Sequence, residues 1–144
     1  GEEGLAAYVR AALDVLGAER IDHGVRSADD PELLQRLAQT QVALTVCPLS
    51  NVRLCVFEQL AQHNLPELLQ AGLRITINSD DPAYFGGYIN DNFLQLQQAM
   101  PQLTPSHFYT MLYNSLQASF APQTDIARWT QALDKLWESA LNAA

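Results

Sequence analysis

The sequence predicts an α/β fold in which short parallel strands alternate with helices and the last part of the chain is helical. Short apolar runs are separated by segments with helical periodicity, which is typical of parallel strands joined by right-handed helical crossovers. Polar groups follow each apolar run, at His23, at residues 47–51 and at Asp80 with Asp81. The carboxyl ends of the strands are where α/β folds bind ligands and carry out chemistry.

The first part of the chain contains two predicted helices with a strand between them. Apolar residues at helical spacing predict a helix over residues 5–16, and the short run 20–23 predicts a strand. Asp30 and Pro31 are typical of a helix N-cap and of the first helical position. A helix is therefore expected over residues 31–38.

The middle of the chain contains two further strands and two loops. Residues 42–46 are apolar and partly β-branched, which predicts a strand buried on both sides. We expect a loop over residues 48–51, because it contains Pro and Asn, then a short helix over 65–70 and a strand over 73–77. A proline and a glycine pair predict an irregular loop over residues 82–87.

Three helices are expected to follow, over residues 91–99, 105–116 and 126–141. The last carries an apolar stripe formed by Trp129, Leu133 and Trp137. Such a stripe is typical of packing, so it is expected to close an outer layer or to contribute to a homo-oligomer contact.

The number of strands indicates that this α/β unit is part of a larger structure. Three parallel strands cannot close a barrel and would leave two unpaired sheet edges. A closed (β/α)8 barrel typically needs about 250 residues. The chain has 144 residues and begins at Gly1 rather than Met. We therefore expect residues 1–144 to form the carboxyl-terminal portion of one (β/α)8 TIM barrel domain. The alternative is a non-catalytic half-barrel that requires a partner chain.

The composition excludes several classes of partner. Eight basic residues stand against sixteen acidic ones, so the net charge of −8 offers no footprint for nucleic acid or for an anionic membrane surface. No apolar run approaches the roughly 18 residues that span a bilayer. Two cysteines are too few for a disulfide framework, which predicts a reducing, cytoplasmic setting.

The adjacent carboxylates Asp80 and Asp81 are the sharpest local signal. They are explained either by a turn or helix cap, or by a site in which one carboxylate binds a metal or its water and the other contacts substrate. His23 ends a predicted strand, although a lone histidine is more often a structural residue. Glu2 and Glu3 are expected in the first turn of a helix, where carboxylates are favoured by the helix dipole alone.

The remaining histidines and Cys47 carry weaker signals. His63 and His107 are interpreted as structural or surface residues. Cys47 lacks the C-x-x-C spacing of zinc and redox sites and is expected to be a small buried hydrophobe.

Four motifs together resemble the adenosine/adenine deaminase family. They are Gly-Glu-Glu-Gly at residues 1–4, Arg-Ile-Asp-His-Gly at 20–24, Thr-Val-Cys-Pro-Leu-Ser-Asn at 45–51 and Asn-Ser-Asp-Asp-Pro at 78–82. Their order and spacing match the family's carboxyl-terminal portion over essentially the whole chain. Residues 83–88, Ala-Tyr-Phe-Gly-Gly-Tyr, are more similar to the adenine deaminase branch than to typical adenosine deaminases.

This resemblance implies a zinc-dependent (β/α)8 barrel that hydrolyses adenine to hypoxanthine and ammonia, with adenosine as the alternative substrate. It implies that Glu2 shuttles a proton, that His23 orients the attacking water, that Asp80 binds zinc and its water, and that Asp81 hydrogen-bonds the purine N7. The family's amino-terminal His-x-His pair and the His of His-Ala-Gly-Glu are absent from this sequence. Because a catalytic zinc usually needs three protein ligands, the 144 residues alone are expected to be inactive.

Overall fold

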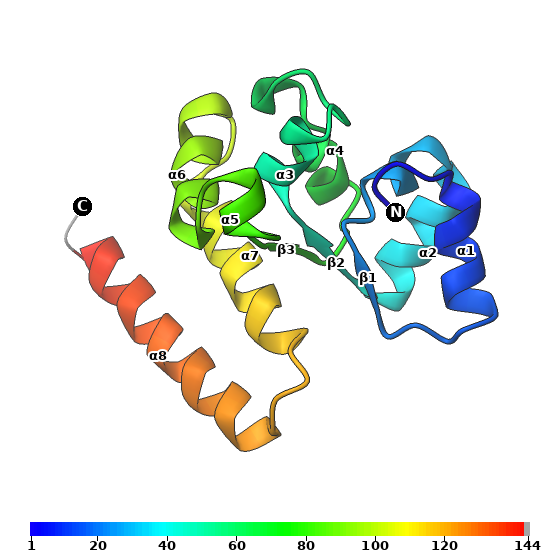
Figure 1. Cartoon of the computed structure of the whole chain (residues 1–144). Helices are drawn as coiled ribbons and strands as arrows, with labels where there is room; N and C mark the ends of the chain where they lie inside the picture. The colour runs from blue at the N-terminus through cyan, green and yellow to red at the C-terminus, as the bar shows by residue number, and fades with distance from the viewer. Residues whose placement is uncertain (143–144) are drawn as a thin grey trace.

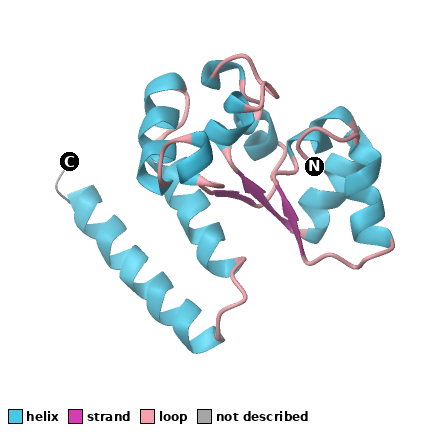
Figure 2. Cartoon of the chain, in the orientation of Figure 1, coloured by secondary structure: helices cyan, strands magenta, loops and turns pink. Residues whose placement is uncertain are grey.

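The centre of the fold is a three-stranded parallel sheet with strand order β1-β2-β3. The computed structural model describes residues 1–142. The strands are β1 (Arg20–Asp22), β2 (Ala43–Val46) and β3 (Ile75–Ile77), and Figure 2 shows them crossing the middle of the molecule with helices around them. The three predicted strands and their parallel pairing are confirmed.

Helices cover the sheet and form the whole carboxyl-terminal part (Figure 1). The α-helices are α1 (Ala6–Asp14), α2 (Pro31–Thr40), α3 (Pro48–Arg53), α4 (Leu65–Gln70), α5 (Pro82–Phe85), α6 (Ile89–Ala99), α7 (Pro105–Gln117) and α8 (Gln123–Asn142). Two 3-10 helices are η1 (Val25–Asp29) and η2 (Leu60–Gln62). The predicted cap is present at α2, where the Asp30 carboxylate accepts a hydrogen bond from the Leu33 amide at 3.1 Å.

The two faces of the sheet differ in character. Alternate residues, Ile21, Leu44, Val46, Ile75 and Ile77, are buried in one core with the apolar faces of α2, α4, α6 and α7. The opposite face carries Arg20, Asp22, Thr45, Thr76 and Asn78, which line a pocket. The prediction that β2 is buried on both sides is therefore wrong at Thr45, which is only partly buried because it faces the pocket.

At one edge of the sheet, part of the backbone hydrogen bonding is provided by another segment of this chain. The sequence predicted two unpaired edges. Helix α7 makes extensive contact with β3. The Asn114 side-chain amide donates to the Ile75 carbonyl at 3.0 Å, on the side of β3 that faces away from β2. A side chain here replaces part of a neighbouring strand's hydrogen bonding.

Two segments predicted as loops contain short helices. Residues 48–53 form α3 and residues 82–85 form α5. Both start with proline, whose fixed φ suits the first helical position and whose missing N–H costs nothing there. The expectation for Glu2 and Glu3 is also wrong: α1 begins at Ala6, so both residues precede the helix.

The carboxyl-terminal helices pack against each other. The Tyr109 hydroxyl donates to Asp134 Oδ1 at 2.6 Å, and its ring lies 5.0 Å from that of Trp137. Leu133 and Trp137 line an apolar groove of about 810 Å³ between α6, α7 and α8, whereas Trp129 is 39% exposed. Leu133 and Trp137 thus pack beside α6 and α7, whereas the expected contact of the stripe with another subunit stays a prediction. Among the described residues, none of the helices has the length and apolarity to cross a membrane.

Candidate active site

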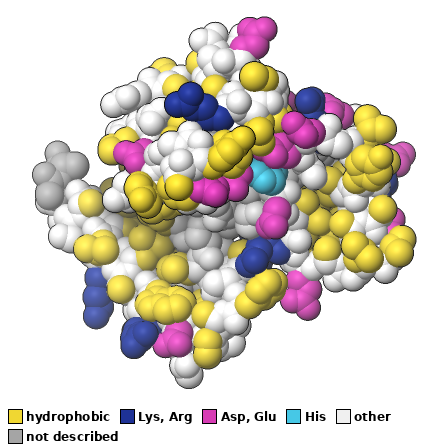
Figure 3. Space-filling view, in the orientation of Figure 1, with side chains coloured by type: hydrophobic (Ala, Val, Ile, Leu, Met, Phe, Trp, Pro, Cys, Tyr) yellow, Lys and Arg dark blue, Asp and Glu magenta, His cyan; other side chains and the backbone are white. Residues whose placement is uncertain are grey.

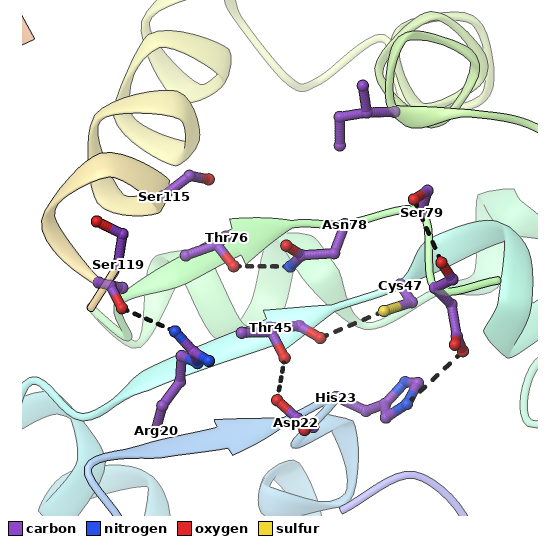
Figure 4. A pocket seen from close by; sticks show the side chains of 13 residues that line it. Arg20, Asp22, His23, Thr45, Cys47, Thr76, Asn78, Ser79, Ser115 and Ser119 are labelled. Atoms are coloured by element: carbon purple, nitrogen blue, oxygen red, sulfur yellow. Dashed lines mark hydrogen bonds and ion pairs between the residues drawn. The ribbon is translucent and has the colours of Figure 1, made fainter. Parts of the chain in front are cut away.

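A pocket of about 610 Å³ opens on the polar face of the sheet. His23, Cys47 and Asp80 lie at its rim, each just beyond the carboxyl end of a different strand. Figure 3 shows a histidine side chain beside acidic side chains at a hollow in the middle of this face. Figure 4 shows His23 among the side chains that line this pocket, together with Thr45, Thr76 and Asn78 from the strands. The ends of all three strands therefore converge as the sequence predicted.

Left-handed backbone turns at the strand ends direct the site residues inward. His23 has φ 58° and Asp80 has φ 57°, a conformation that few residues other than glycine adopt. Gly24 follows with φ 77°, and a Cβ on it would lie 2.7 Å from Leu44 Cδ2 in the core. The glycine after His23 is thus required by both its backbone conformation and its close approach to the core.

Glu2 reaches the site from the segment before α1. Its Oε1 accepts a hydrogen bond from Asn51 Nδ2 at 2.6 Å and lies 3.3 Å from His23 Nδ1. Arg26 holds this segment, since its backbone amide donates to the Gly1 carbonyl and its Nε donates to the Glu2 carbonyl, each at 3.1 Å. The Glu2 side chain is 16% exposed, so the carboxyl group lies in a largely desolvated position beside the imidazole.

Asp80 faces His23 from the end of β3. Its Oδ2 lies 3.8 Å from His23 Nε2 and accepts a hydrogen bond from Ser50 Oγ at 2.7 Å. Ligand atoms of His23, Cys47 and Asp80 lie within 4.8 Å of one another. Carboxylate oxygen and imidazole nitrogen are donors that zinc accepts, so these side chains fit a zinc-bound site in their chemistry.

Cys47 is buried beside these groups, as expected for a small hydrophobe. Its Sγ donates weakly to the Thr45 carbonyl at 3.5 Å. Burial, followed by the nearby carboxylates of Asp80 and Glu2, raises the pKa of the Cys47 thiol to about 12. Without a bound metal the thiol is therefore protonated at neutral pH, and zinc would have to displace this proton to bind the sulfur.

Asp81 turns away from its neighbour. Its Oδ1 caps α5 by accepting hydrogen bonds from the Ala83 and Tyr84 amides at 3.0 and 3.1 Å. The helix-cap explanation thus applies to Asp81, whereas Asp80 lines the pocket. The expected difference in direction between the two carboxylates is confirmed. The contact of Asp81 with a purine stays a prediction.

Three polar residues of the site had no assigned role in the sequence. Ser50 and Asn51 are fully buried on α3, and His63 is 3% exposed. The first two belong to the motif at residues 45–51, which was the only signal that could have identified them. His63 Nε2 lies 3.1 Å from Asn51 Oδ1, and burial lowers the pKa of His63 to about 4. His63 is thus buried, so the surface location that the sequence left open is wrong.

Comparison with known proteins agrees with this arrangement. The family model for adenosine deaminase matches residues 1–136. An adenine deaminase of Trichlorobacter lovleyi is 55% identical over 138 residues, which make up 96% of this chain and 40% of that protein. The crystal structure of adenine deaminase from Arthrobacter aurescens superposes with a TM-score of 0.91 at 49% identity, over 96% of this chain and 42% of that one. An amidohydrolase from Burkhoderia ambifaria with bound zinc superposes with a TM-score of 0.84 over 96% of this chain and 39% of that one; at 24% identity this likeness shows the fold alone.

The chain spans about 40% of the length of the curated relatives it matches. The predicted fold class is confirmed, because the sheet and its helices superpose on part of a (β/α)8 barrel enzyme. That residues 1–144 form one portion of a single domain stays a prediction. The family model covers all four motifs and nearly the whole chain. The chain therefore belongs to the adenosine deaminase family.

Proposed function

We propose that this chain supplies the proton-transferring and water-orienting residues of a zinc-dependent deaminase that hydrolyses adenine to hypoxanthine and ammonia. The observation that carries the proposal is the convergence of three groups from distant parts of the chain. Glu2 Oε1 lies 3.3 Å from His23 Nδ1, and His23 Nε2 lies 3.8 Å from Asp80 Oδ2. Hydrolytic deamination needs a proton donor and groups that orient and deprotonate a water. One carboxylic acid, an imidazole and a second carboxylate can fill these roles.

Asp80 is the zinc ligand that this chain would provide, and the other ligands would come from outside it. The carboxylate oxygen of Asp80 is a donor that zinc accepts, which supports this choice of metal. When bound, zinc lowers the pKa of water toward about 7 and so supplies hydroxide at neutral pH. The chain's contribution is to hold the Asp80 carboxylate in place, through the hydrogen bond from buried Ser50.

Each site residue has a separate role in the proposed reaction. Protonated Glu2 donates to the purine N1 and makes C6 electrophilic. His23 and Asp80 orient the water for attack on C6, and one proton of the water is relayed to the amino group, which departs as ammonia. The second proton leaves the new C6 hydroxyl as the 6-oxo group forms and returns to Glu2, which restores the acid. Asp81 must be protonated, or meet a base protonated at N7, to hydrogen-bond that nitrogen. Its free Oδ2 is the oxygen left for this contact, because Oδ1 caps α5.

Adenine is the proposed substrate rather than adenosine. Two relatives that are 55% and 52% identical to this chain over the aligned residues are named adenine deaminases. The 144 residues alone are proposed to be inactive, because they lack the remaining zinc ligands of the family. A cytoplasmic location and a homo-oligomeric state are further proposals, which rest on the cysteine usage and the exposed apolar stripe of α8.

A hybrid enzyme tests the proposal. In this hybrid, the present chain replaces the matching 40% of the Trichlorobacter lovleyi adenine deaminase. We expect zinc-dependent release of ammonia from adenine, with a higher kcat/KM for adenine than for adenosine. Glu2→Gln should lower kcat by about 10²–10⁴-fold, the usual contribution of a general acid. Glu3→Gln is the matched control, because Glu3 is exposed and adjacent. Equal activity of the two variants would contradict the role of Glu2. A folded hybrid that deaminates neither adenine nor adenosine would contradict the proposed deaminase function.

A further inference from the structure

The orientation of the His63 ring is determined by its two hydrogen-bond partners. Its Nδ1 accepts a hydrogen bond from the Leu65 backbone amide at 3.0 Å, so Nδ1 carries no proton. The proton of the neutral ring must then be on Nε2, which lies 3.1 Å from Asn51 Oδ1 and donates to it. The Phe57 ring lies 4.3 Å away and restrains the imidazole further.

His63 in turn determines the orientation of the Asn51 amide. With Oδ1 facing His63, the amide nitrogen faces the site, where it donates to Glu2 Oε1 at 2.6 Å and lies 3.4 Å from His23 Nδ1. A reversed amide would place two oxygen atoms 2.6 Å apart and two N–H groups against each other. Asn51 is fully buried, so water cannot compensate for such a reversal.

The fixed amide also selects one oxygen of Glu2. Oε1 accepts the hydrogen bond from Asn51, and the carbonyl oxygen of a carboxylic acid is the better acceptor, so this contact favours a proton on Oε2. A general acid is effective only when its proton points at the atom that receives it. The chain of contacts therefore runs from the Leu65 amide through His63 and Asn51 to the oxygen from which Glu2 donates.

We propose that His63 is a positioning residue for Glu2, acting through the Asn51 amide. The proposal rests on the function proposed above and adds to it a residue that lies outside the pocket. His63 makes no contact with the reacting groups, so its effect is on the geometry of proton transfer and not on binding. Its low pKa keeps the ring neutral, and hence in a single tautomer, at physiological pH.

Two substitutions at one position separate positioning from folding. In the hybrid enzyme, His63→Phe keeps a planar ring beside Phe57 but removes the donor to Asn51. His63→Gln keeps an N–H donor near the place of Nε2 but loses the ring. We expect His63→Phe to lower kcat by about 10–100-fold, the usual effect of removing a residue that orients a ligand or catalyst, with KM nearly unchanged. His63→Gln should restore most of kcat.

His107→Phe is the matched control. The His107 ring nitrogen also accepts a backbone hydrogen bond, from the Thr104 amide at 3.0 Å, but this residue is exposed at the start of α7. The His107→Phe substitution should leave kcat unchanged. Adding His63→Phe to Asn51→Ala should cost little more than Asn51→Ala alone, because both changes remove one interaction. Equal loss in His63→Phe and His63→Gln, or losses that multiply with Asn51→Ala, would overturn the proposal.

A spectroscopic measurement keeps this inference separate from the function. The ¹⁵N chemical shifts of the His63 ring in the hybrid should report the Nε2–H tautomer at pH 7. An Nδ1–H tautomer would overturn the inference even if adenine is deaminated, and this readout remains if His63→Phe fails to fold. Absence of deamination together with the Nε2–H tautomer would instead count against the proposed function. It would not contradict the series of hydrogen bonds from His63 through Asn51 to Glu2.

Discussion

The hydroxyl of Ser50 donates a hydrogen bond to Asp80 Oδ2 at 2.7 Å, although the two residues are 30 positions apart in the sequence. Ser50 is fully buried on α3, and Asp80 lies in the short segment between β3 and α5. This bond joins α3, which follows β2, to the segment that follows the neighbouring strand β3. It also determines the direction of the carboxylate, which would otherwise rotate freely at a site with 29% side-chain exposure.

Removing the Ser50 hydroxyl should weaken zinc binding. We expect Ser50→Ala in the hybrid enzyme to lower zinc affinity by about 10–100-fold, because partners that orient a ligand usually contribute that much. Competition with a chromophoric chelator measures it. Ser79→Ala is the control, since the Ser79 hydroxyl contacts only the Asp80 backbone carbonyl. If both variants retain zinc equally, the Ser50 bond does not support the metal.

Replacing Cys47 should leave the metal in place. The pKa of its thiol is raised to about 12, so at pH 7 zinc would have to displace a firmly held proton to bind the sulfur. We expect Cys47→Ala to keep the zinc content of the hybrid, measured by elemental analysis after dialysis. Loss of zinc in this variant would instead identify the His23, Cys47 and Asp80 group as the metal site.

Gly24 should tolerate alanine less well than another glycine with positive φ. Alanine at either Gly24 or Gly72 must adopt the left-handed region, at a cost of about 1–2 kcal/mol. At Gly24 the new Cβ would also lie 2.7 Å from the buried Leu44 side chain, whereas nothing lies within 4 Å at Gly72. Overpacking adds about 1–3 kcal/mol. Urea unfolding should therefore show a larger loss for Gly24→Ala, and similar losses would mean that Leu44 moves aside.

Burial of His63 should make the protein less stable as the pH falls. The folded pKa of about 4 is below the ordinary value of 6.5, so between these values the unfolded chain binds a proton that the folded chain does not. The stabilisation is complete above pH 6.5 and is lost toward pH 4, in total about 3 kcal/mol. Urea unfolding at several pH values measures the free energy of unfolding. Between pH 4 and 6.5 this free energy should change more steeply with pH in the hybrid that keeps His63 than in the His63→Gln variant. Parallel slopes would contradict a buried neutral imidazole.

The local elements could be predicted because their causes are short-range. The spacing of apolar residues and the Asp30-Pro31 cap specify α2 without reference to the rest of the chain, and the β-branched run specifies β2. Two short helices were predicted as loops, because the same Pro residues that are typical of turns also start helices.

The contacts of the site could not be predicted in the same way. Asn51 is 49 positions from Glu2 and 12 from His63, and nothing in the sequence pattern pairs them. The direction of Asp81 was also open, because a carboxylate before proline serves equally well as a cap or as a ligand to substrate.

The sequence by itself determined the strands, most helices and, through four motifs, the family to which the chain belongs. The tertiary structure alone decided which polar groups meet. The physical reason is that periodicity and capping act over a few residues, whereas the contacts of Glu2, Asn51, His63 and Asp80 arise only when the strand ends and α3 pack around one pocket.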